Sequence, residues 1–327
     1  MELVTKKRLM LFNGRGNAEL AEEIAECLKV PLGEVVLSTF ANGEIYCRYR
    51  ESVRGADVFV LQTHCAPIND MIVEQMLMID AAKRASAKRI TAVCPFYGYA
   101  RQDRKAEGRE PISARLLADA LTVAGADRLV TVDLHTGQIQ GFFDCPVDHL
   151  TAVPLLAEYL AEKVTGDVTV VSPDAGGGKL TRRFANFLQA SEIDAEMAFI
   201  DKRRPKGTHN VAEAVEVVGV VEDRTCVLID DMIDTAGTVT SAAELLVERG
   251  AREVYILATH GLLSGPAIDR LRDAPVTEVV VSNTLPIPAE KRFDKLTVLS
   301  IAQTVADALD AVFEDTSVSE LFRGDNV

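Results

Sequence analysis

Residues 227–238, VLIDDMIDTAGT, place two adjacent carboxylates at the end of an apolar run. The run predicts a buried strand. Successive side chains of a strand point to opposite faces, so Asp230 and Asp231 cannot both serve one core. At least one of them should face the crevice at the carboxyl end of the sheet, where open α/β proteins bind ligands. There a carboxylate can accept hydrogen bonds from vicinal sugar hydroxyls, directly or through Mg²⁺.

The same stretch continues into a turn of small residues that precedes a helical pattern: Asp234, Thr235, Ala236, Gly237 and Thr238. Gly237 permits a turn that other residues resist, and the N–H groups of such a turn and of the helix start bind an anion. Because the turn has no lysine, a single phosphate fits it better than a triphosphate. Phosphate at one end and a diol at the other describe a pentose 5-phosphate. The alternative, an ordinary strand, turn and helix with a capping aspartate, is disfavoured by the double aspartate.

A second charged segment, RQDRK at residues 101–105, follows another apolar run. Its arginines can bind phosphate oxygens with both arms of the guanidinium group, although such a loop is also common on a solvated surface. His135 comes just after a predicted strand that ends in Asp133, and could bind a metal, orient a phosphate or stabilise the core. The residues alone leave these alternatives open.

A basic cluster, Lys202, Arg203 and Arg204, ends a further apolar run and precedes the turn-rich PKGTHN. Taken alone, such a cluster is normally part of a solvated surface. The histidines without a surrounding motif are expected to be structural: His64, His149, His209 and His260.

Alternating strands and helices must position these residues. Short apolar runs alternate with amphipathic helical patterns almost throughout, which is typical of α/β proteins with a mostly parallel sheet. A chain of 327 residues exceeds the usual size of one core, so two domains are expected, at 1–150 and 151–302, with a C-terminal helix and tail at 303–327. The segments around Asp133 and Asp230 both end an apolar run on acidic residues, which suggests duplication.

The composition narrows the classes of partner. A net charge of −14 disfavours nucleic acid or an anionic membrane as partners, so an anionic ligand must be met by local groups or metal ions. The 6 cysteines show no C-x-x-C spacing and are expected to be reduced thiols of a cytoplasmic protein. A signal-peptide pattern and an apolar run of membrane-spanning length are absent from the sequence.

The stretch 227–238 resembles the phosphoribosyl-pyrophosphate loop of the phosphoribosyltransferase superfamily. Nearly the whole chain resembles the ribose-phosphate diphosphokinase (PRPP synthetase) family of the bacterial class I type. The further matching segments are FANGE (40–44), YARQDRK (99–105), DLHTGQIQGFFD (133–144), VSPDAGG (171–177) and IDKRRP (200–205). The resemblance implies two phosphoribosyltransferase-like domains that transfer the pyrophosphoryl group of ATP to the 1-hydroxyl of ribose 5-phosphate.

The resemblance also implies roles for single residues. Those expected to contact ATP are Phe40, Asn42, Glu44, Arg101, Gln102, Asp103 and His135, with Phe40 stacking on adenine. His135 and Asp174 would hold the Mg²⁺ that bridges the ATP phosphates. Lys202 and Arg204 would act with His135 in catalysis, by closing over the transferring group. The ribose 5-phosphate site would comprise Asp230, Asp231, Asp234, Thr235, Ala236, Gly237 and Thr238.

Regulation and assembly are implied in the same way. The family resemblance implies a homohexamer with inorganic phosphate as activator and ADP as inhibitor. The matching positions are Ser52, Arg54, Ser317, Ser319 and Phe322, although a plain turn also explains ESVRG at 51–55. Two rival functions conflict with the sequence: a salvage phosphoribosyltransferase should lack RQDRK and DKRRP, and a non-catalytic partner subunit should have lost one of the catalytic groups.

Overall fold

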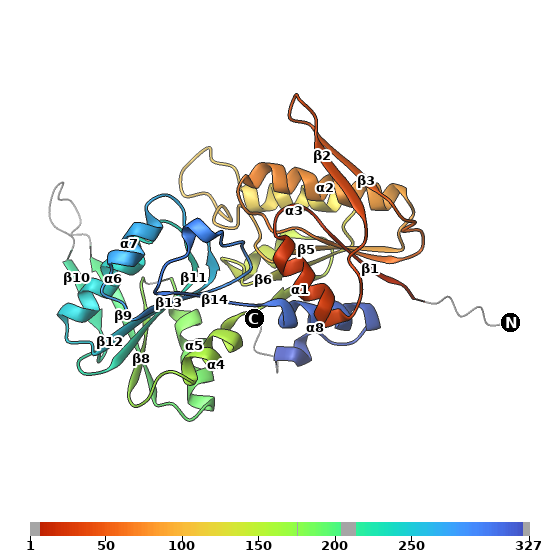
Figure 1. The fold of residues 1–327 in the computed structure, drawn as a ribbon. Helices are drawn as coiled ribbons and strands as arrows, with labels where there is room; N and C mark the ends of the chain where they lie inside the picture. The colour runs from red at the N-terminus through yellow and green to blue at the C-terminus, as the bar shows by residue number, and fades with distance from the viewer. Residues whose placement is uncertain (1–6, 175, 204–213, 323–327) are drawn as a thin grey trace. The chain divides into compact units, whose positions relative to one another are not determined.

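The computed structural model describes residues 7–174, 176–203 and 214–322 of the chain (Figure 1). Its contacts divide the chain into two compact units. Unit 1 comprises residues 1–151, 284–286 and 300–327, and unit 2 comprises 152–283 and 287–299. Among the described residues, no helix has the length and apolar character needed to cross a membrane.

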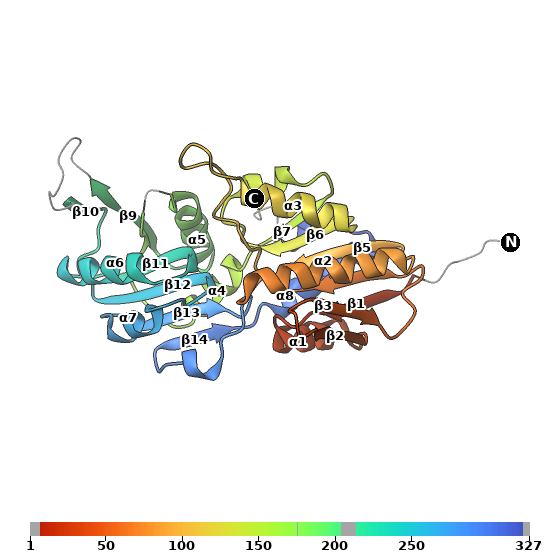
Figure 2. The same cartoon turned by 90° about the horizontal axis from the view of Figure 1, so that it is seen from above.

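Unit 1 is built on a parallel sheet of five strands in the order β1-β4-β5-β6-β7. These strands are β1 (Leu9–Asn13), β4 (Asp57–Leu61), β5 (Arg89–Cys94), β6 (Arg128–Val132) and β7 (Val147–Leu150). Helices α2 (Ile68–Arg84) and α3 (Ser113–Ala124) cover one face of the sheet, and α1 (Ala18–Leu28) and α8 (Ala302–Glu314) cover the other (Figures 1 and 2). The unit also contains the hairpin of β2 (Val35–Thr39) and β3 (Ile45–Tyr49) and the short helices η1 (Gly137–Phe142) and η3 (Ser319–Phe322).

Unit 2 contains a sheet of seven strands in the order β10-β9-β8-β11-β12-β13-β14, in which the β9–β10 pair is antiparallel and the other pairs are parallel. The strands are β8 (Val168–Ser172), β9 (Ala195–Arg203), β10 (Ala214–Val218), β11 (Thr225–Ile233), β12 (Glu253–Gly261), β13 (Glu278–Ser282) and β14 (Leu296–Leu299). The helices are α4 (Val153–Ala161), α5 (Gly178–Ala190), α6 (Gly237–Glu248), α7 (Ala267–Asp273) and η2 (Ala289–Lys291).

The two units share one topology. In each, the first strand is followed by a helix and a hairpin, and four more parallel strands complete the order: β1-β4-β5-β6-β7 corresponds to β8-β11-β12-β13-β14. The hairpin of unit 2 joins the main sheet through β9, whereas that of unit 1 forms a sheet of its own. This repetition is the pattern expected of a duplicated domain.

The helix that follows the last strand of each half packs in the other unit. Helix α4 follows β7 of unit 1 but packs on α5 in unit 2, and α8 follows β14 of unit 2 but packs on α1 in unit 1. The sequence predicts a separate helix and tail at 303–327, but in the structure the described part of this segment belongs to unit 1. The reason is that the apolar stripe of α8, which includes Val305 and Leu309, meets the stripe of α1 formed by Leu20 and Ile24.

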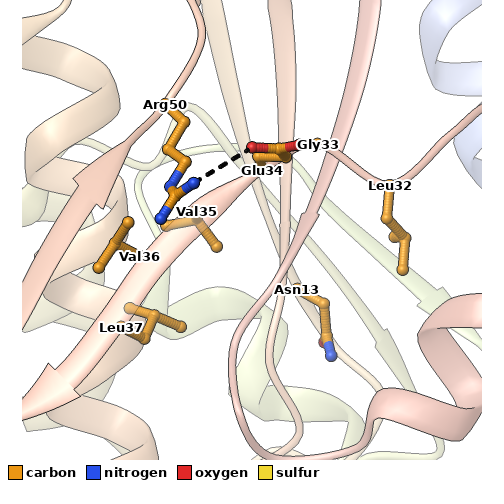
Figure 3. Close-up of a pocket in the computed structure, with 8 residues that line it drawn as sticks. All are labelled: Asn13, Leu32, Gly33, Glu34, Val35, Val36, Leu37 and Arg50. Atoms are coloured by element: carbon orange, nitrogen blue, oxygen red, sulfur yellow. Dashed lines mark ion pairs between the residues drawn. The ribbon is translucent and has the colours of Figure 1, made fainter.

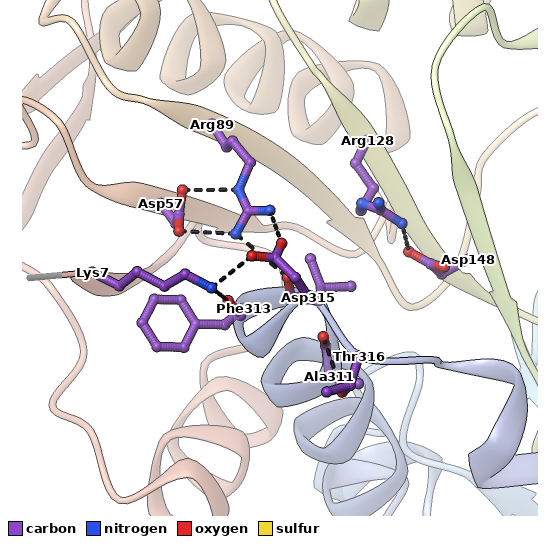
Figure 4. A network of polar contacts seen from close by, with 10 residues as sticks. Lys7, Asp57, Arg89, Arg128, Asp148, Ala311, Phe313, Asp315 and Thr316 are labelled. Carbon is purple, nitrogen blue, oxygen red and sulfur yellow. Dashed lines mark hydrogen bonds and ion pairs between the residues drawn. The ribbon is translucent and has the colours of Figure 1, made fainter. Parts of the chain in front are cut away.

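Charged side chains fasten the end of α8 inside unit 1 (Figure 4). Arg89 forms two bonds of 2.9 Å with Asp57 and one of 2.5 Å with Asp315. The Nζ of Lys7 donates to Asp315 at 2.6 Å and to the carbonyl of Phe313 at 3.0 Å. The hydrogen bond from Lys7 and the guanidinium of Arg89 lower the pKa of Asp315. These contacts therefore join the segment before β1, the strands β4 and β5, and the end of α8.

Candidate functional site

The two adjacent carboxylates of unit 2 lie where β11 loses one of its neighbours. β11 pairs with β8 from Thr225 to Leu228, but it pairs with β12 as far as Ile233. Beyond Leu228 the edge of β11 that faced β8 is therefore no longer paired with it, and Asp230 and Asp231 lie there, partly buried. The prediction that the strand ends at the aspartates was wrong, because β12 continues to pair with it.

The carboxylates at this edge repel one another. The N–H of Asp231 donates to Oδ1 of Asp230 at 2.9 Å. Burial, the charge of Asp231 and, to a smaller degree, that of Asp174 raise the pKa of Asp230. Carboxylates that are desolvated beside like charges bind protons, hydroxyl groups or cations more readily than isolated carboxylates do. The edge is therefore suited to a ligand that brings hydrogen-bond donors or positive charge.

The turn after β11 has an alanine, and not the expected glycine, at its left-handed position. Ala236 adopts the left-handed conformation, with φ 61° and ψ 0°, so the expectation that Gly237 makes this turn was wrong. An alanine in this region costs about 1–2 kcal/mol. Gly237 is instead the first residue of α6, and a Cβ there would lie 3.2 Å from the guanidinium of Arg270. Thr235 and Thr238 are exposed.

The turn is held by the segment after β12. The N–H of Ser264 donates to the carbonyl of Asp234 at 2.8 Å, and Nη1 of Arg270 donates to the carbonyl of Thr235 at 2.9 Å. Arg270 thus also brings a positive charge close to a turn that has no lysine. The sequence gives no signal for Arg270, because no motif surrounds it and it lies 35 residues from Thr235 along the chain.

Asp174 lies in the turn after β8, at the same edge of the sheet of unit 2. Its Oδ1 accepts hydrogen bonds from the N–H groups of Gly176 and Gly177 at 2.7 and 3.1 Å, and the residue is exposed. The described residues contain no cluster of three or more His, Cys, Asp or Glu that could hold a metal ion. One exposed carboxylate nevertheless suits Mg²⁺, which usually takes one or two carboxylates together with waters and substrate phosphates.

The residues expected to contact adenine lie at the tip of the β2–β3 hairpin of unit 1. The N–H of Phe40 donates to the carbonyl of Glu44 at 2.8 Å, and Oδ1 of Asn42 accepts from the N–H of Glu44 at 3.2 Å. The side chain of Phe40 is 54% exposed, and Tyr46 contacts it edge-on. An exposed aromatic ring on a defined turn provides a surface on which a base can stack.

The RQDRK loop and the segment around His135 meet in unit 1. Asp103 is buried and accepts a hydrogen bond of 2.7 Å from the hydroxyl of Thr136, next to the exposed His135. Gln102 accepts from Ser113 at 2.6 Å, and Arg101 is exposed. Asp103 and Gln102 therefore fix the loop, while Arg101 faces solvent.

Among the histidines expected to be structural, His149 lies beside the predicted site. Its Nε2 accepts from the N–H of Leu134 at 2.8 Å, which shapes the backbone just before His135. His64 and His260 are buried, with exposed fractions of 1% and 2%. His209 lies outside the described residues.

The other predicted positions are described in part. Lys202 pairs with Val215 in the β9–β10 ladder, and Arg204 lies outside the described residues. Ser52 and Arg54 are exposed in the turn before β4. Ser317 and Ser319 are also exposed, and Phe322 ends η3.

A cavity in unit 1 lies away from the predicted site residues. It is lined by Asn13 at the end of β1 and by residues at the base of the β2–β3 hairpin, where Glu34 and Arg50 form an ion pair of 3.9 Å (Figure 3). None of the residues predicted to bind a substrate is among those that line it.

Comparison with known proteins adds independent information. The family model described as the N-terminal domain of ribose phosphate pyrophosphokinase matches residues 9–125, and the phosphoribosyl synthetase-associated domain matches residues 195–323. Ribose-phosphate pyrophosphokinase of Streptomyces avermitilis is 56% identical over 97% of both chains. That of Bifidobacterium longum is 54% identical over 97% of this chain and 93% of its own. The crystal structure of phosphoribosylpyrophosphate synthetase from Mycobacterium smegmatis superposes with a TM-score of 0.89 at 54% identity, over 94% of this chain and 100% of its own.

Proposed function

Because this chain belongs to the ribose-phosphate pyrophosphokinase family, we propose that it converts ATP and ribose 5-phosphate into 5-phosphoribosyl 1-pyrophosphate and AMP. The product would supply nucleotide biosynthesis. The observation within the chain that supports this proposal best is the acidic edge of β11 beside the turn 234–238. It combines acceptors for sugar hydroxyls with an anion-binding turn.

The reaction needs a fixed acceptor and neutralised phosphates. In our proposal the 1-hydroxyl of the sugar attacks the β-phosphorus of ATP, the bond from that phosphorus to the α,β-bridging oxygen breaks, and AMP leaves. Asp230 and Asp231 would hold the ring hydroxyls, and the turn 234–238 would hold the 5-phosphate. Reactions of this kind depend mainly on alignment and charge stabilisation, so rigid positioning of the acceptor contributes directly to the rate.

The proposal divides the remaining roles between the units. Phe40, Asn42 and Glu44 would bind adenine, and Arg101, Gln102 and Asp103 would form the nearby phosphate loop. His135 and Asp174 would hold Mg²⁺, which supplies charge neutralisation to the ATP phosphates when bound. Lys202, Arg204 and His135 would act at the transferring group. The exposed ring of Phe40 and the exposed carboxylate of Asp174 suit these roles.

Control and location are part of the same proposal. The chain would work in the cytoplasm as a homohexamer that inorganic phosphate activates and ADP inhibits. Ser52, Arg54, Ser317, Ser319 and Phe322 would belong to the effector site. The exposure of both serines of the tail and of Ser52 and Arg54 is compatible with such a role.

The identity of the nucleotide product tests the proposal. Purified protein is incubated with ATP, ribose 5-phosphate and Mg²⁺, and the nucleotides are separated. We expect AMP in equal amount to 5-phosphoribosyl 1-pyrophosphate, and none when ribose replaces ribose 5-phosphate. ADP as the main product would indicate transfer of the γ-phosphoryl group, and no turnover would favour a non-catalytic partner subunit.

A further inference from the structure

The carboxyl ends of β1 and β4 in unit 1 carry a buried polar network. By the shared strand order these ends correspond to those of β8 and β11, where unit 2 carries Asp174 and the two adjacent aspartates. Unit 1 has Arg15 in the turn after β1 and Gln62 directly after β4. The comparison raises the question of what this edge does in unit 1.

Glu74 of α2 is the centre of the network. Its side chain is 0% exposed, and it accepts hydrogen bonds from the backbone N–H of Arg15 at 2.7 Å and from Arg15 Nε at 2.5 Å. Gln62 donates to the same carboxylate at 2.9 Å and accepts from the N–H of Gly16 at 2.9 Å. A buried carboxylate is tolerated when it is paired and hydrogen-bonded in this way, and removal of a partner is costly.

The turn after β1 packs closely against the residues that follow β4. A Cβ at Gly14 would lie 2.5 Å from the side chain of Gln62, and one at Gly16 would lie 2.6 Å from the carbonyl of Thr63. The backbone of this turn thus packs directly on the end of β4. The end of β4 and the turn after β1 are therefore in close contact in unit 1.

The same network reaches the hairpin that carries Phe40. Nη1 of Arg15 donates to the hydroxyl of Thr39 at 3.1 Å, and Thr39 is the last residue of β2. At the other end of the hairpin, the hydroxyl of Tyr49 donates to the carbonyl of Met78 on α2 at 2.8 Å. The hairpin is therefore attached to α2 twice, once at its base and once beside its tip.

We propose that Arg15, held by Glu74, is a positioning residue for the nucleotide: it fixes the end of β2 and thereby the turn 40–44. The inference rests on the proposed function, because that function assigns adenine to this turn. In unit 2 the corresponding edge would bind the acceptor sugar. In unit 1 this edge would instead support the adenine site.

The test removes the link without disturbing the buried carboxylate. Thr39→Val deletes the hydroxyl that Arg15 contacts, and Thr39→Ser keeps it, while the Arg15–Glu74 pair is unchanged in both. Because Thr39 is exposed at the end of a strand, both variants should fold like the wild type. Ser38→Ala, one residue earlier on the opposite face of β2, is the matched control.

We measure the Kd of ATP by calorimetry and the KM of ATP and of ribose 5-phosphate from initial rates. Loss of a hydrogen bond to a charged group should weaken the binding of ATP by about three- to tenfold in Thr39→Val. KM for ribose 5-phosphate and the thermal midpoint should stay unchanged, and Thr39→Ser and Ser38→Ala should match the wild type. Arg15→Gln should weaken the binding of ATP at least as much as Thr39→Val does.

Two results would overturn the positioning role: ATP affinity within twofold of the wild type in Thr39→Val, or equal losses in Thr39→Val and Thr39→Ser. A wild-type protein that binds ATP but forms no AMP would instead overturn the proposed function. In that case the calorimetric comparison of the variants still decides whether Arg15 positions the nucleotide.

Discussion

At the scale of single residues, the acidic edge of unit 2 holds a carboxyl group whose ionised form lowers the stability of the fold. Asp230 is held in a place where its charge is unfavourable, since burial and Asp231 raise its pKa. An acid whose folded pKa lies above its unfolded value stabilises the fold below the unfolded value, and this contribution is lost as the pH rises through the folded pKa. The ionised form therefore costs stability in the absence of ligand.

We expect Asp230→Asn to raise the free energy of unfolding by about 1–2 kcal/mol at pH 9. The same substitution should weaken the binding of ribose 5-phosphate at least tenfold. The amide has a similar shape but lacks the charge. Urea unfolding and ligand titration check the two effects, with the exposed Glu244→Gln of α6 as control. A loss of stability at pH 9 would contradict this account of the edge.

Lys202 is a residue whose proposed role concerns the transition state. If it stabilises charge that develops during transfer, Lys202→Ala should lower kcat by about a hundredfold or more with KM for both substrates nearly unchanged. Steady-state rates over both substrates provide the measurement. A large rise in KM with unchanged kcat would assign Lys202 to ground-state binding instead.

His64 shows how a buried polar side chain makes unit 1 sensitive to acid. The N–H of Gly98 donates to its Nδ1 at 2.9 Å, so Nε2 carries the proton and donates to Gln75 at 2.9 Å. Burial lowers the pKa of His64 to about 4. The neutral form is the one the fold accommodates, so stability is present above the unfolded pKa of about 6.5 and is lost as the pH falls toward 4.

We predict a loss of roughly 3 kcal/mol from this histidine between pH 6.5 and pH 4. Urea unfolding at pH 7 and pH 5 compares the wild type with His64→Gln, which does not titrate. The variant is less stable at neutral pH, but its stability should fall less between the two pH values. Parallel losses in both proteins would show that other groups cause the acid sensitivity.

At the scale of elements, sequence patterns predict the location of a strand or helix better than its tertiary contacts. Apolar runs indicate the strands, and the small-residue turn after β11 indicates an anion site. The extension of β11 to Ile233 depends on pairing with β12, and the left-handed turn at Ala236 depends on contacts of Ser264 and Arg270. Local patterns carry no information about such partners, so these features could not be predicted.

The packing of α8 on α1 gives a prediction at this scale. Leu309 is 0% exposed, and Leu309→Ala should cost about 2–5 kcal/mol through lost burial and the resulting cavity. Hydrogen exchange should then increase in α1 and β1 of unit 1. Leu156→Ala in α4, also 0% exposed, is the matched variant and should increase exchange in α5 of unit 2. Increased exchange in the same unit for both variants would contradict the assignment of the helices.

At the scale of the whole molecule, the sequence predicted the α/β class, the duplication and the family, and the comparisons and the fold confirm these. The packing of α8 in unit 1 could not be predicted from the sequence. The amphipathic pattern of residues 302–314 predicts that one face of the helix is buried, but it does not predict which surface of the protein covers that face. The same limit applies to Arg15, whose partners Thr39 and Glu74 are distant in sequence.

The exchange of α4 and α8 also affects how the protein is made. During translation α1 leaves the ribosome early, whereas α8 is synthesised near the end of the chain. At about 5–20 residues per second, the stripe around Leu20 and Ile24 stays without its native cover for on the order of tens of seconds. Unit 2 acquires α4 just before its own strands and meets no such delay. We therefore expect the nascent first half to need protection by chaperones until α8 emerges.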